Sequence, residues 1–183
     1  MATHHGAVNI NITDYGVWKA ATLNEAYDMD NTYGCQCWDY CAEFWYNTHH
    51  YVYPYLQTGP LGYAYECWTV SRAINAADQF DLITRLQDVK QGDVVVFGQL
   101  SGWVGVTGHI AFADEDYNGS GYMNILGQNQ NGHQYVNIFR IKTDSFLGAF
   151  RYKGWITPPP PTPTPTKKKF PWYILAQRRR NMI

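Results

Sequence analysis

The sequence predicts an α+β domain in which N-terminal helices pack on one face of a curled antiparallel sheet. Helix signals come first in the chain, and we expect three helices in its first half. Short segments rich in β-branched and aromatic residues, separated by turn residues, dominate the second half. A run of helices followed by a run of strands is typical of α+β domains.

The predicted helices begin with residues 13–24, where Thr13 or Asp14 can cap the first turn. A second helix is predicted where apolar side chains recur three and four positions apart, which places them on one helix face. These residues are Cys37, Tyr40, Cys41 and Phe44. We expect a third helix over residues 68–78.

Five segments are predicted to be strands because they are short and rich in β-forming residues. They are residues 93–97, 108–114, 121–129, 134–141 and 148–153. Turn-forming residues stand between them, for example at 118–121 and 130–132. Strands joined by short turns are antiparallel, so we expect neighbouring strands in the sequence to pair in the sheet.

A proline-rich segment divides the chain into three parts. Residues 158–166 read PPPPTPTPT, which is typical of a stiff polyproline II linker. We therefore expect one globular domain over residues 1–157, a Pro/Thr linker over 158–166 and a basic, aromatic tail over 167–183.

The composition argues against several classes of protein. The formal net charge is -1 and charged residues make up 16% of the chain, so no overall basic field would attract nucleic acid. No apolar run reaches the roughly 18–20 residues needed to cross a bilayer. The N-terminus also lacks the cationic start and apolar run of a secretory signal peptide. We expect no nucleic-acid partner, no membrane span and no signal peptide.

Four cysteines are present, and three of them lie within seven residues: Cys35, Cys37 and Cys41, with Cys67 farther along. Such tight spacing makes a poor disulfide framework because bridge geometry is demanding. We expect Cys41 and Cys67 to be small buried apolar residues. A zinc site made by the four thiols is the alternative, although structural zinc sites usually space paired ligands by two to four residues.

Cys37 is the candidate nucleophile because it lies where a turn-rich loop becomes a helix. The start of a helix carries a partial positive charge and free backbone N–H groups, which stabilise both a thiolate and an oxyanion. We therefore expect the helix start to lower the pKa of the Cys37 thiol. Burial in the core is the alternative for any lone cysteine.

His109, in TGHIAFAD near the start of a predicted strand, is the candidate base. A Cys–His pair needs a third group to orient the imidazole, and Asn129 in ILGQNQNG can supply an amide oxygen from a neighbouring strand. A core histidine satisfied by one hydrogen bond is the alternative for His109.

Four segments in this order resemble the CHAP domain, the cysteine- and histidine-dependent amidohydrolase/peptidase family. They are QCWD, GDVVVFG, GHIAFAD and QNQNG, and the resemblance covers roughly residues 25–154. It implies a papain-like fold, with Cys37 as nucleophile, His109 as base, and Gln128 and Asn129 as the QN pair of the family. Asn129 would then orient His109.

The sequence departs from this pattern at one position. Phage lysins of the family often carry a glutamate just before the QN pair, where this chain has Gly127. The resemblance then implies a three-member site of Cys37, His109 and Asn129, a combination sufficient in papain-type proteases. We expect Gln36, Trp38, Trp103 and Gln128 to form substrate or oxyanion contacts, with core or rim packing as the alternative for the aromatic rings.

The loop DMDNTYGCQCWD before the second helix resembles the calcium loop of some phage lysins. Calcium takes six to eight oxygen ligands from carboxylates and carbonyls. The resemblance implies Ca²⁺ bound by Asp28, Asp30 and Asp39, with Thr32 and Gly34 giving backbone carbonyls. A solvated acidic loop in which Asp39 caps the helix is the alternative.

The resemblance implies a peptidoglycan hydrolase that cuts an amide bond, either as an N-acetylmuramoyl-L-alanine amidase or as an endopeptidase of the stem or cross-bridge. A phage endolysin or virion-associated lysin is expected, present in the host cytoplasm before lysis or in the virion. Residues 167–183 would bind another virion protein or an anionic envelope, or form an unstructured solubilising end. The alternative is an inactive CHAP-fold virion structural or wall-binding protein.

Overall fold

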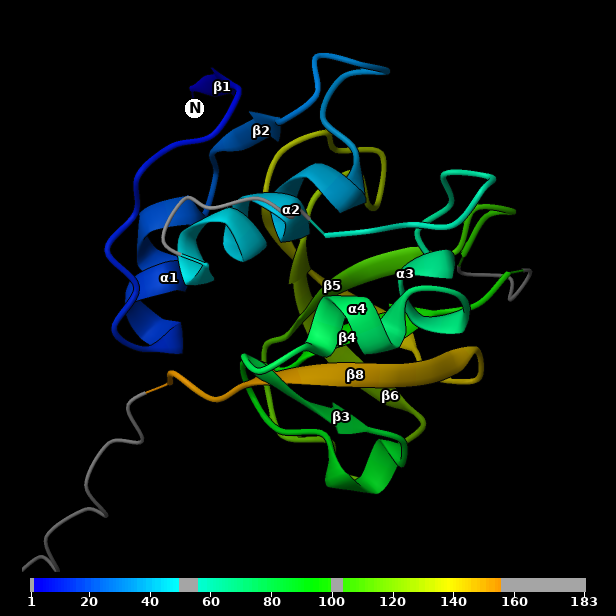
Figure 1. Cartoon of the computed structure of the whole chain (residues 1–183). Helices are drawn as coiled ribbons and strands as arrows, with labels where there is room; N and C mark the ends of the chain where they lie inside the picture. The colour runs from blue at the N-terminus through cyan, green and yellow to red at the C-terminus, as the bar shows by residue number, and fades with distance from the viewer. Residues whose placement is uncertain (1, 50–55, 100–103, 156–183) are drawn as a thin grey trace, which may run out of the picture.

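The computed structural model describes residues 2–49, 56–99 and 104–155 and places helices against a six-stranded antiparallel sheet (Figure 1). The strand order is β3-β8-β4-β5-β6-β7. Their bounds are β3 (Phe80–Ile83), β4 (Val94–Phe97), β5 (His109–Ala113), β6 (Tyr122–Gly127), β7 (Asn137–Lys142) and β8 (Phe146–Tyr152). This arrangement confirms the predicted fold class.

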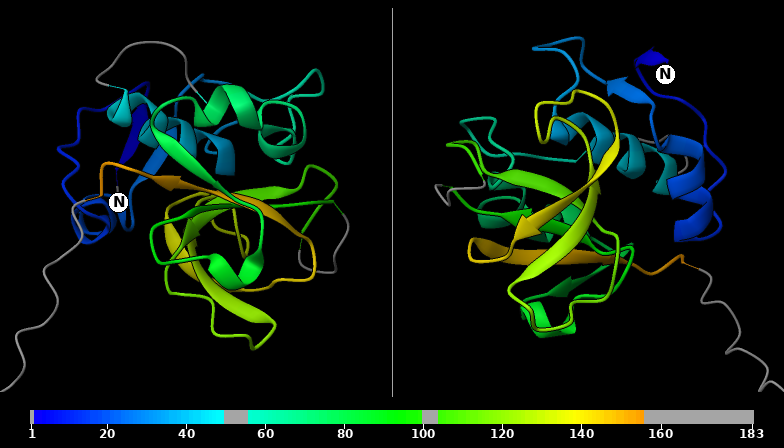
Figure 2. Two further views of the ribbon diagram at one scale, coloured as in Figure 1. Left: turned by 60° about the horizontal axis from the view of Figure 1, so that its bottom comes forward. Right: turned by 180° about the vertical axis from the view of Figure 1, so that it is seen from behind.

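The sheet is sequential only in part. Strands β4 to β7 pair in chain order, as predicted, but β8 returns to lie between β3 and β4. The sheet curls, so its two faces enclose different sets of side chains (Figure 2). Since β4 and β5 lie inside the sheet, their register fixes where His109 stands: it pairs with Phe97 at the end of β4.

The sheet has a buried cluster on each face. Val94 and Val96 of β4 join the cluster under the helices, whereas Val95 and Phe97 join the cluster on the opposite face. Alternate residues of a strand face opposite sides, so a strand buried on both sides is apolar throughout. This explains the unbroken apolar run of residues 94–97.

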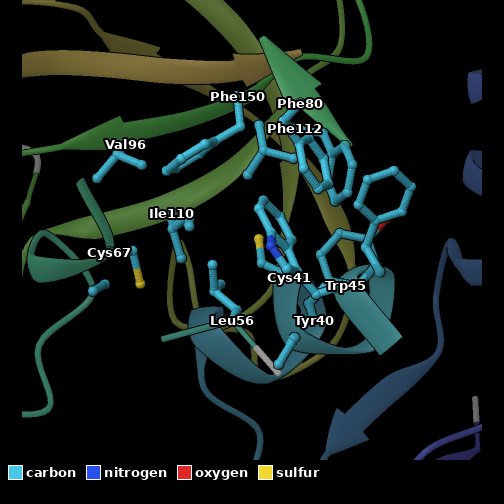
Figure 3. Close-up of a cluster of buried hydrophobic side chains, with 14 of the residues drawn as sticks. Tyr40, Cys41, Trp45, Leu56, Cys67, Phe80, Val96, Ile110, Phe112 and Phe150 are labelled. Carbon is cyan, nitrogen blue, oxygen red and sulfur yellow. The ribbon is translucent and has the colours of Figure 1, made fainter. Parts of the chain in front are cut away.

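Aromatic side chains fill much of the core between the helices and the sheet. Trp45 stacks on Phe80 at a centroid distance of 4.3 Å, and Phe44 meets Phe112 edge-on at 4.9 Å. Figure 3 shows Cys41 and Trp45 below the sheet residues of this cluster. Much of the high aromatic content is therefore core packing, which stabilises the domain by burying large apolar surfaces.

The helices keep the predicted order with one change. Helix α1 (Tyr15–Thr22) is capped by Asp14, whose carboxylate accepts the Val17 N–H at 2.9 Å, and α2 (Cys37–Thr48) follows. The single helix predicted over residues 68–78 is instead two short helices, α3 (Glu66–Thr69) and α4 (Arg72–Ala76). At the break, the Ser71 hydroxyl donates to the Thr58 carbonyl at 2.6 Å, which ties the chain to a preceding loop.

Four further elements were not expected from the sequence. Strands β1 (Thr3–His5) and β2 (Ala26–Asp28) pair in parallel, β3 lies at one edge of the larger sheet, and a 3-10 turn, η1 (Leu86–Asp88), follows β3. All four cysteines are free, and both Cys41 and Cys67 are buried as predicted. Among the described residues, no helix is long and apolar enough to cross a membrane. The predicted linker, the predicted tail and Trp103 lie outside the described residues.

Candidate active site

Cys37 is the first residue of α2, as the sequence predicted, and it is half-buried as a whole residue. The preceding residue, Gln36, caps the helix. Asp39 in the first turn accepts the Gln36 N–H at 2.8 Å, so the carboxylate satisfies a backbone donor and complements the helix dipole. These contacts fix the backbone on both sides of the thiol.

His109 is the first residue of β5, the strand that packs against α2. Cys37 and His109 line one pocket of 350 Å³ together with Asn129 and Gln130. The backbone of Ile110, the residue after His109, also lies close enough to the Cys37 thiol to lower its pKa. The fold therefore brings together two side chains that are 72 positions apart in the sequence.

Burial governs the protonation of this pair. It raises the pKa of the Cys37 thiol to about 11, although hydrogen bonds from the backbone of Ile110 and Trp38 act in the opposite direction. It also lowers the pKa of His109 below its usual value. The expected lowering of the Cys37 pKa is therefore wrong for this conformation, because desolvation outweighs the helix start. Both shifts favour the uncharged forms, the thiol of Cys37 and the unprotonated imidazole of His109.

The side chain that contacts His109 is Gln130. Its Oε1 atom lies 3.0 Å from His109 Nε2, and both residues are buried. Asn129, which was predicted to orient His109, instead donates from Nδ2 to Gln36 Oε1 at 2.7 Å. The reason is local: Asn129 has a φ of +54°, so the chain turns and the next residue, rather than Asn129, faces the imidazole.

Gln128 ties three parts of the chain together. Its side chain accepts the Tyr27 N–H at 2.8 Å, and its Nε2 donates to the carbonyls of Tyr27 at 2.7 Å and Gln36 at 2.8 Å. It is fully buried. The predicted substrate contact of Gln128 is corrected accordingly: this residue anchors the segment before Cys37 to β2 and lies away from the pocket surface.

A second, larger hollow of 570 Å³ lies on the other side of Cys37. Gln36, Cys37 and Thr107 line both hollows, so the thiol stands where the two meet. The predicted contact Trp38 lines the larger hollow, where its indole N–H donates to the Leu56 carbonyl at 3.0 Å. An extended substrate can thus pass across the thiol, with one part in each hollow.

Gln36 is held at both ends of its carboxamide. Its Nε2 donates to the Tyr33 carbonyl at 2.7 Å and its Oε1 accepts from Asn129. A carboxamide carries two N–H bonds, so one remains for another acceptor. Together with the backbone N–H at the start of α2, this group can stabilise a negative oxygen formed beside Cys37.

Three predicted metal ligands come together beside the larger hollow. Carboxylate oxygens of Asp28, Asp30 and Asp39 lie within 4.8 Å of one another. Asp28 Oδ1 is buried and has no hydrogen-bond partner among the described residues. Burial, and to a smaller extent the neighbouring Asp30 and Asp28, raise the pKa of Asp39 to about 6, although the backbone hydrogen bonds from Gln36 and Met29 act in the opposite direction. An unpartnered buried oxygen among crowded carboxylates fits a hard cation such as calcium.

The other predicted ligands lie in the same loop. Thr32 donates its N–H to Asp30 Oδ1 at 2.8 Å and its hydroxyl to the Asp30 carbonyl at 3.2 Å. Gly34 has a φ of +70° in the turn before Cys37. Carbonyl ligation by Thr32 and Gly34 stays a prediction.

Two groups that contact the Cys37–His109 pair were not predicted from the sequence. Gln130 was overlooked because it follows the QN pair directly, and only the turn at Asn129 reveals which amide faces inward. The Ile110 N–H was overlooked because backbone donors leave no sequence signal.

Known proteins resemble this chain in sequence and fold. The chain is 34% identical over 141 residues to a D-alanyl-L-alanine endopeptidase of Streptococcus phage B30, covering 76% of this chain and 30% of that protein. The chain therefore spans about a third of the length of this relative. The crystal structure of the endolysin LysIME-EF1 aligns with a TM-score of 0.53 at 20% identity, covering 77% of this chain and 65% of that one, which is a likeness of fold.

The family model of the CHAP domain matches residues 26–129, a segment that contains Cys37, His109 and Asn129. This segment is more than half of the chain. With the α+β architecture and the pocket that joins α2 to β5, the match leads to one assignment: the chain belongs to the CHAP domain family.

Proposed function

We propose that this domain hydrolyses amide bonds in bacterial peptidoglycan, with Cys37 as the nucleophile and His109 as the general base. The observation that carries the proposal is the placement of both side chains in one pocket, at the starts of α2 and β5. The curated relative is named as a D-alanyl-L-alanine endopeptidase, which supports a peptide bond of the wall as the substrate.

The proposed reaction begins with a neutral pair. As the Cys37 sulfur attacks the carbonyl carbon, His109 takes the thiol proton, so no free thiolate has to form beforehand. The N–H groups at the start of α2 and of the Gln36 carboxamide bind the resulting oxyanion. When the intermediate collapses, the C–N bond breaks and His109 gives the proton to the leaving amine.

The second half of the reaction restores the enzyme. His109 accepts a proton from water as the water oxygen attacks the thioester carbon, and the C–S bond then breaks. The acid product leaves and the proton returns to the Cys37 sulfur. The two hollows on either side of Cys37 give separate places to the acyl part and the amine part of the substrate.

The class of bond has two candidates, the muramoyl–L-alanine amide and a peptide bond of the stem or cross-bridge. The name of the phage relative favours the peptide bond. An extended peptide fits a groove that continues on both sides of the nucleophile. Mass spectrometry of digested peptidoglycan identifies the bond from the new amino terminus.

We also propose that Ca²⁺ binds at Asp28, Asp30 and Asp39, with carbonyls of Thr32 and Gly34 completing the site. The unpartnered Asp28 oxygen and the crowding of the three carboxylates support this. The ion would neutralise the acidic cluster and hold the loop that leads into α2. Its part is structural, because Asp39 also accepts the N–H groups of Met29 and Gln36.

The biological setting is proposed from the relatives and the sequence. A phage relative and an endolysin fold favour a phage lysin that acts on the host wall at lysis or from the virion. The six cations and the apolar centre of residues 167–183 favour binding to another virion protein. Pull-down of virion proteins with and without these residues tests that part.

The catalytic proposal is tested with two cysteine variants on purified cell walls. Cys37→Ala is expected to abolish clearing, because it removes the nucleophile. Cys41→Ala, one turn along α2 and fully buried, is the matched control and is expected to keep clearing while lowering the melting temperature. Equal clearing by Cys37→Ala and the parent protein would rule out thiol catalysis and leave a wall-binding role.

A further inference from the structure

Gln130 has a fixed orientation beside the imidazole. Its Nε2 donates to the Asn137 carbonyl at 2.7 Å, and a carbonyl can only accept. The carboxamide therefore presents Oε1, its acceptor end, to His109 Nε2 at 3.0 Å. This assigns the ring proton to Nε2 and leaves the lone pair of Nδ1 available as the base.

The backbone around Gln130 holds the side chain in this place. Gln130 and His133 exchange backbone hydrogen bonds of 3.1 and 2.9 Å across Asn131 and Gly132, which both have positive φ. This is the geometry of a two-residue hairpin turn. The pairing of Gly127 with Asn137 at the ends of β6 and β7 brings the Asn137 carbonyl to the carboxamide.

Gly127 leaves the space that the Gln130 carboxamide fills. A Cβ atom at position 127 would lie 2.8 Å from Gln130 Oε1 and 2.8 Å from the Ala111 Cβ. Any side chain at this position would push the oxygen away from His109. The absence of a side chain at Gly127 and the inward position of Gln130 therefore belong to one arrangement.

We propose that Gln130 is the positioning residue of this site: it holds His109 as the Nε2–H tautomer and aims Nδ1 at the Cys37 side of the pocket. This rests on the proposed catalytic role of His109. Asn129, one residue earlier, supports Gln36 and so acts on the other half of the site.

A neutral partner has a chemical consequence. Of the described residues that line this pocket, only Cys37 and His109 titrate and none carries a fixed charge. An amide orients the ring without stabilising the imidazolium as a carboxylate would. His109 thus stays unprotonated, and ready to accept a proton, down to lower pH than a histidine beside a carboxylate.

The test uses Gln130→Met, which keeps the length of the side chain without its hydrogen bonds. We expect kcat to fall about 100-fold with little change in KM, since a misdirected base loses much of its contribution. Gln130→Glu restores an acceptor and adds a charge. It should recover most of kcat and move the acid limb of the pH profile upward by about one unit or more.

The ring tautomer is read directly from the ¹⁵N chemical shifts of His109 in the Cys37→Ala background, where activity plays no part. The Nε2–H form should dominate with Gln130, lose its dominance in Gln130→Met, and persist in Asn129→Ala. Circular dichroism and the melting temperature show whether each variant is folded. If Gln130→Met does not fold, Gln130→Glu replaces it in the measurement.

Two results would overturn the inference. The first is that folded Gln130→Met keeps both the His109 tautomer and the kcat of the parent. The second is that Asn129→Ala loses the Nε2–H form while Gln130→Met keeps it, which would show that Asn129 orients His109. Failure of the proposed function would look different, because Cys37→Ala would then still clear walls whatever the tautomer.

Discussion

Gly108, the residue before His109, has a backbone φ of +71° and almost no free space around its α-carbon. A Cβ atom there would lie 2.5 Å from the Phe97 carbonyl oxygen and 2.8 Å from the Tyr65 Cβ. The Tyr65 N–H also bonds to the Thr107 carbonyl at 3.2 Å. The glycine therefore lets β4 and the start of α3 close around the base.

We predict that Gly108→Ala costs about 3 kcal/mol of folding free energy, since it combines a strained φ with a backbone clash. For a domain of this size that is about 6–12 °C in melting temperature. Calorimetry measures the change, and Gly105→Ala is the control, because nothing lies within 4 Å of the atom it adds. Equal melting temperatures for Gly108→Ala and the parent would contradict the argument.

At the residue scale, the sequence led to Cys37 and His109 but misassigned the amides of QNQNG. The first two could be found because helix starts and strand starts leave local patterns. Gln128, Asn129 and Gln130 could not be told apart, because the left-handed Asn129 interrupts the alternation of side chains just beyond the end of β6. The raised pKa of Cys37 depends on burial by distant strands, which a local motif does not encode.

At the scale of elements, α2 carries the nucleophile and also binds the N-terminal segment. Glu43 and Asn47, one turn apart, accept the N–H groups of Val8 at 2.9 Å and Ile10 at 2.7 Å. Asn47 also donates to the Val8 carbonyl at 3.1 Å. These side chains bind backbone groups of the segment before α1 that a neighbouring strand would otherwise bind. Helix α2 is therefore held on two faces, by the sheet on one and by the N-terminal segment on the other.

Glu43 makes this attachment sensitive to pH. Burial raises its pKa from 4.5 to about 7, and its Oε2 atom is buried with no partner among the described residues. An acid whose pKa is higher in the folded state holds its proton more tightly there. Stability then falls as pH rises from the unfolded to the folded pKa.

We predict that Glu43→Gln removes this loss, because glutamine keeps the acceptor for the Val8 N–H without the charge. Relative to the parent, the variant should gain up to about 3 kcal/mol between pH 4.5 and pH 7.5, measured by urea unfolding. Cys41→Ala, a fully buried substitution on the same helix that leaves the Glu43 contacts intact, is the control and should lose stability by a similar amount at both pH values. Parallel pH profiles for Glu43→Gln and the parent would sink this explanation.

The elements themselves were predicted unevenly, for physical reasons. Strands β4 to β8 were recognisable because each combines β-forming residues with flanking turns. Strands β1 to β3 have only three or four residues and lack the unbroken run of β-forming residues that marks the equally short β4. The place of β8 between β3 and β4 comes from pairing between distant segments, which local patterns do not specify.

For the molecule as a whole, the acidic cluster lies where separate parts of the fold meet. Asp28 ends β2, Asp39 lies in the first turn of α2, and Gln128 links both regions to the end of β6. Three carboxylates within 4.8 Å repel one another, so the contact between β2 and the first turn of α2 is under electrostatic strain without a cation. A bound ion would turn this repulsion into a cross-link between helix and sheet.

We predict that Ca²⁺ raises the melting temperature and that chelation lowers melting temperature and activity together. An ion at about 100 times its dissociation constant adds about 2.7 kcal/mol, or roughly 5–10 °C for a domain of this size. Asp28→Asn should remove the calcium-dependent part of the shift, whereas Asp81→Asn, at an exposed ion pair with Lys153, should retain it. Because the ion stabilises the loop before Cys37 without touching the sulfur, the ¹⁵N tautomer of His109 should be the same with and without calcium. A melting temperature of the parent protein that is identical in calcium and in chelator would mean that the carboxylates only cap α2 and hold their own loop.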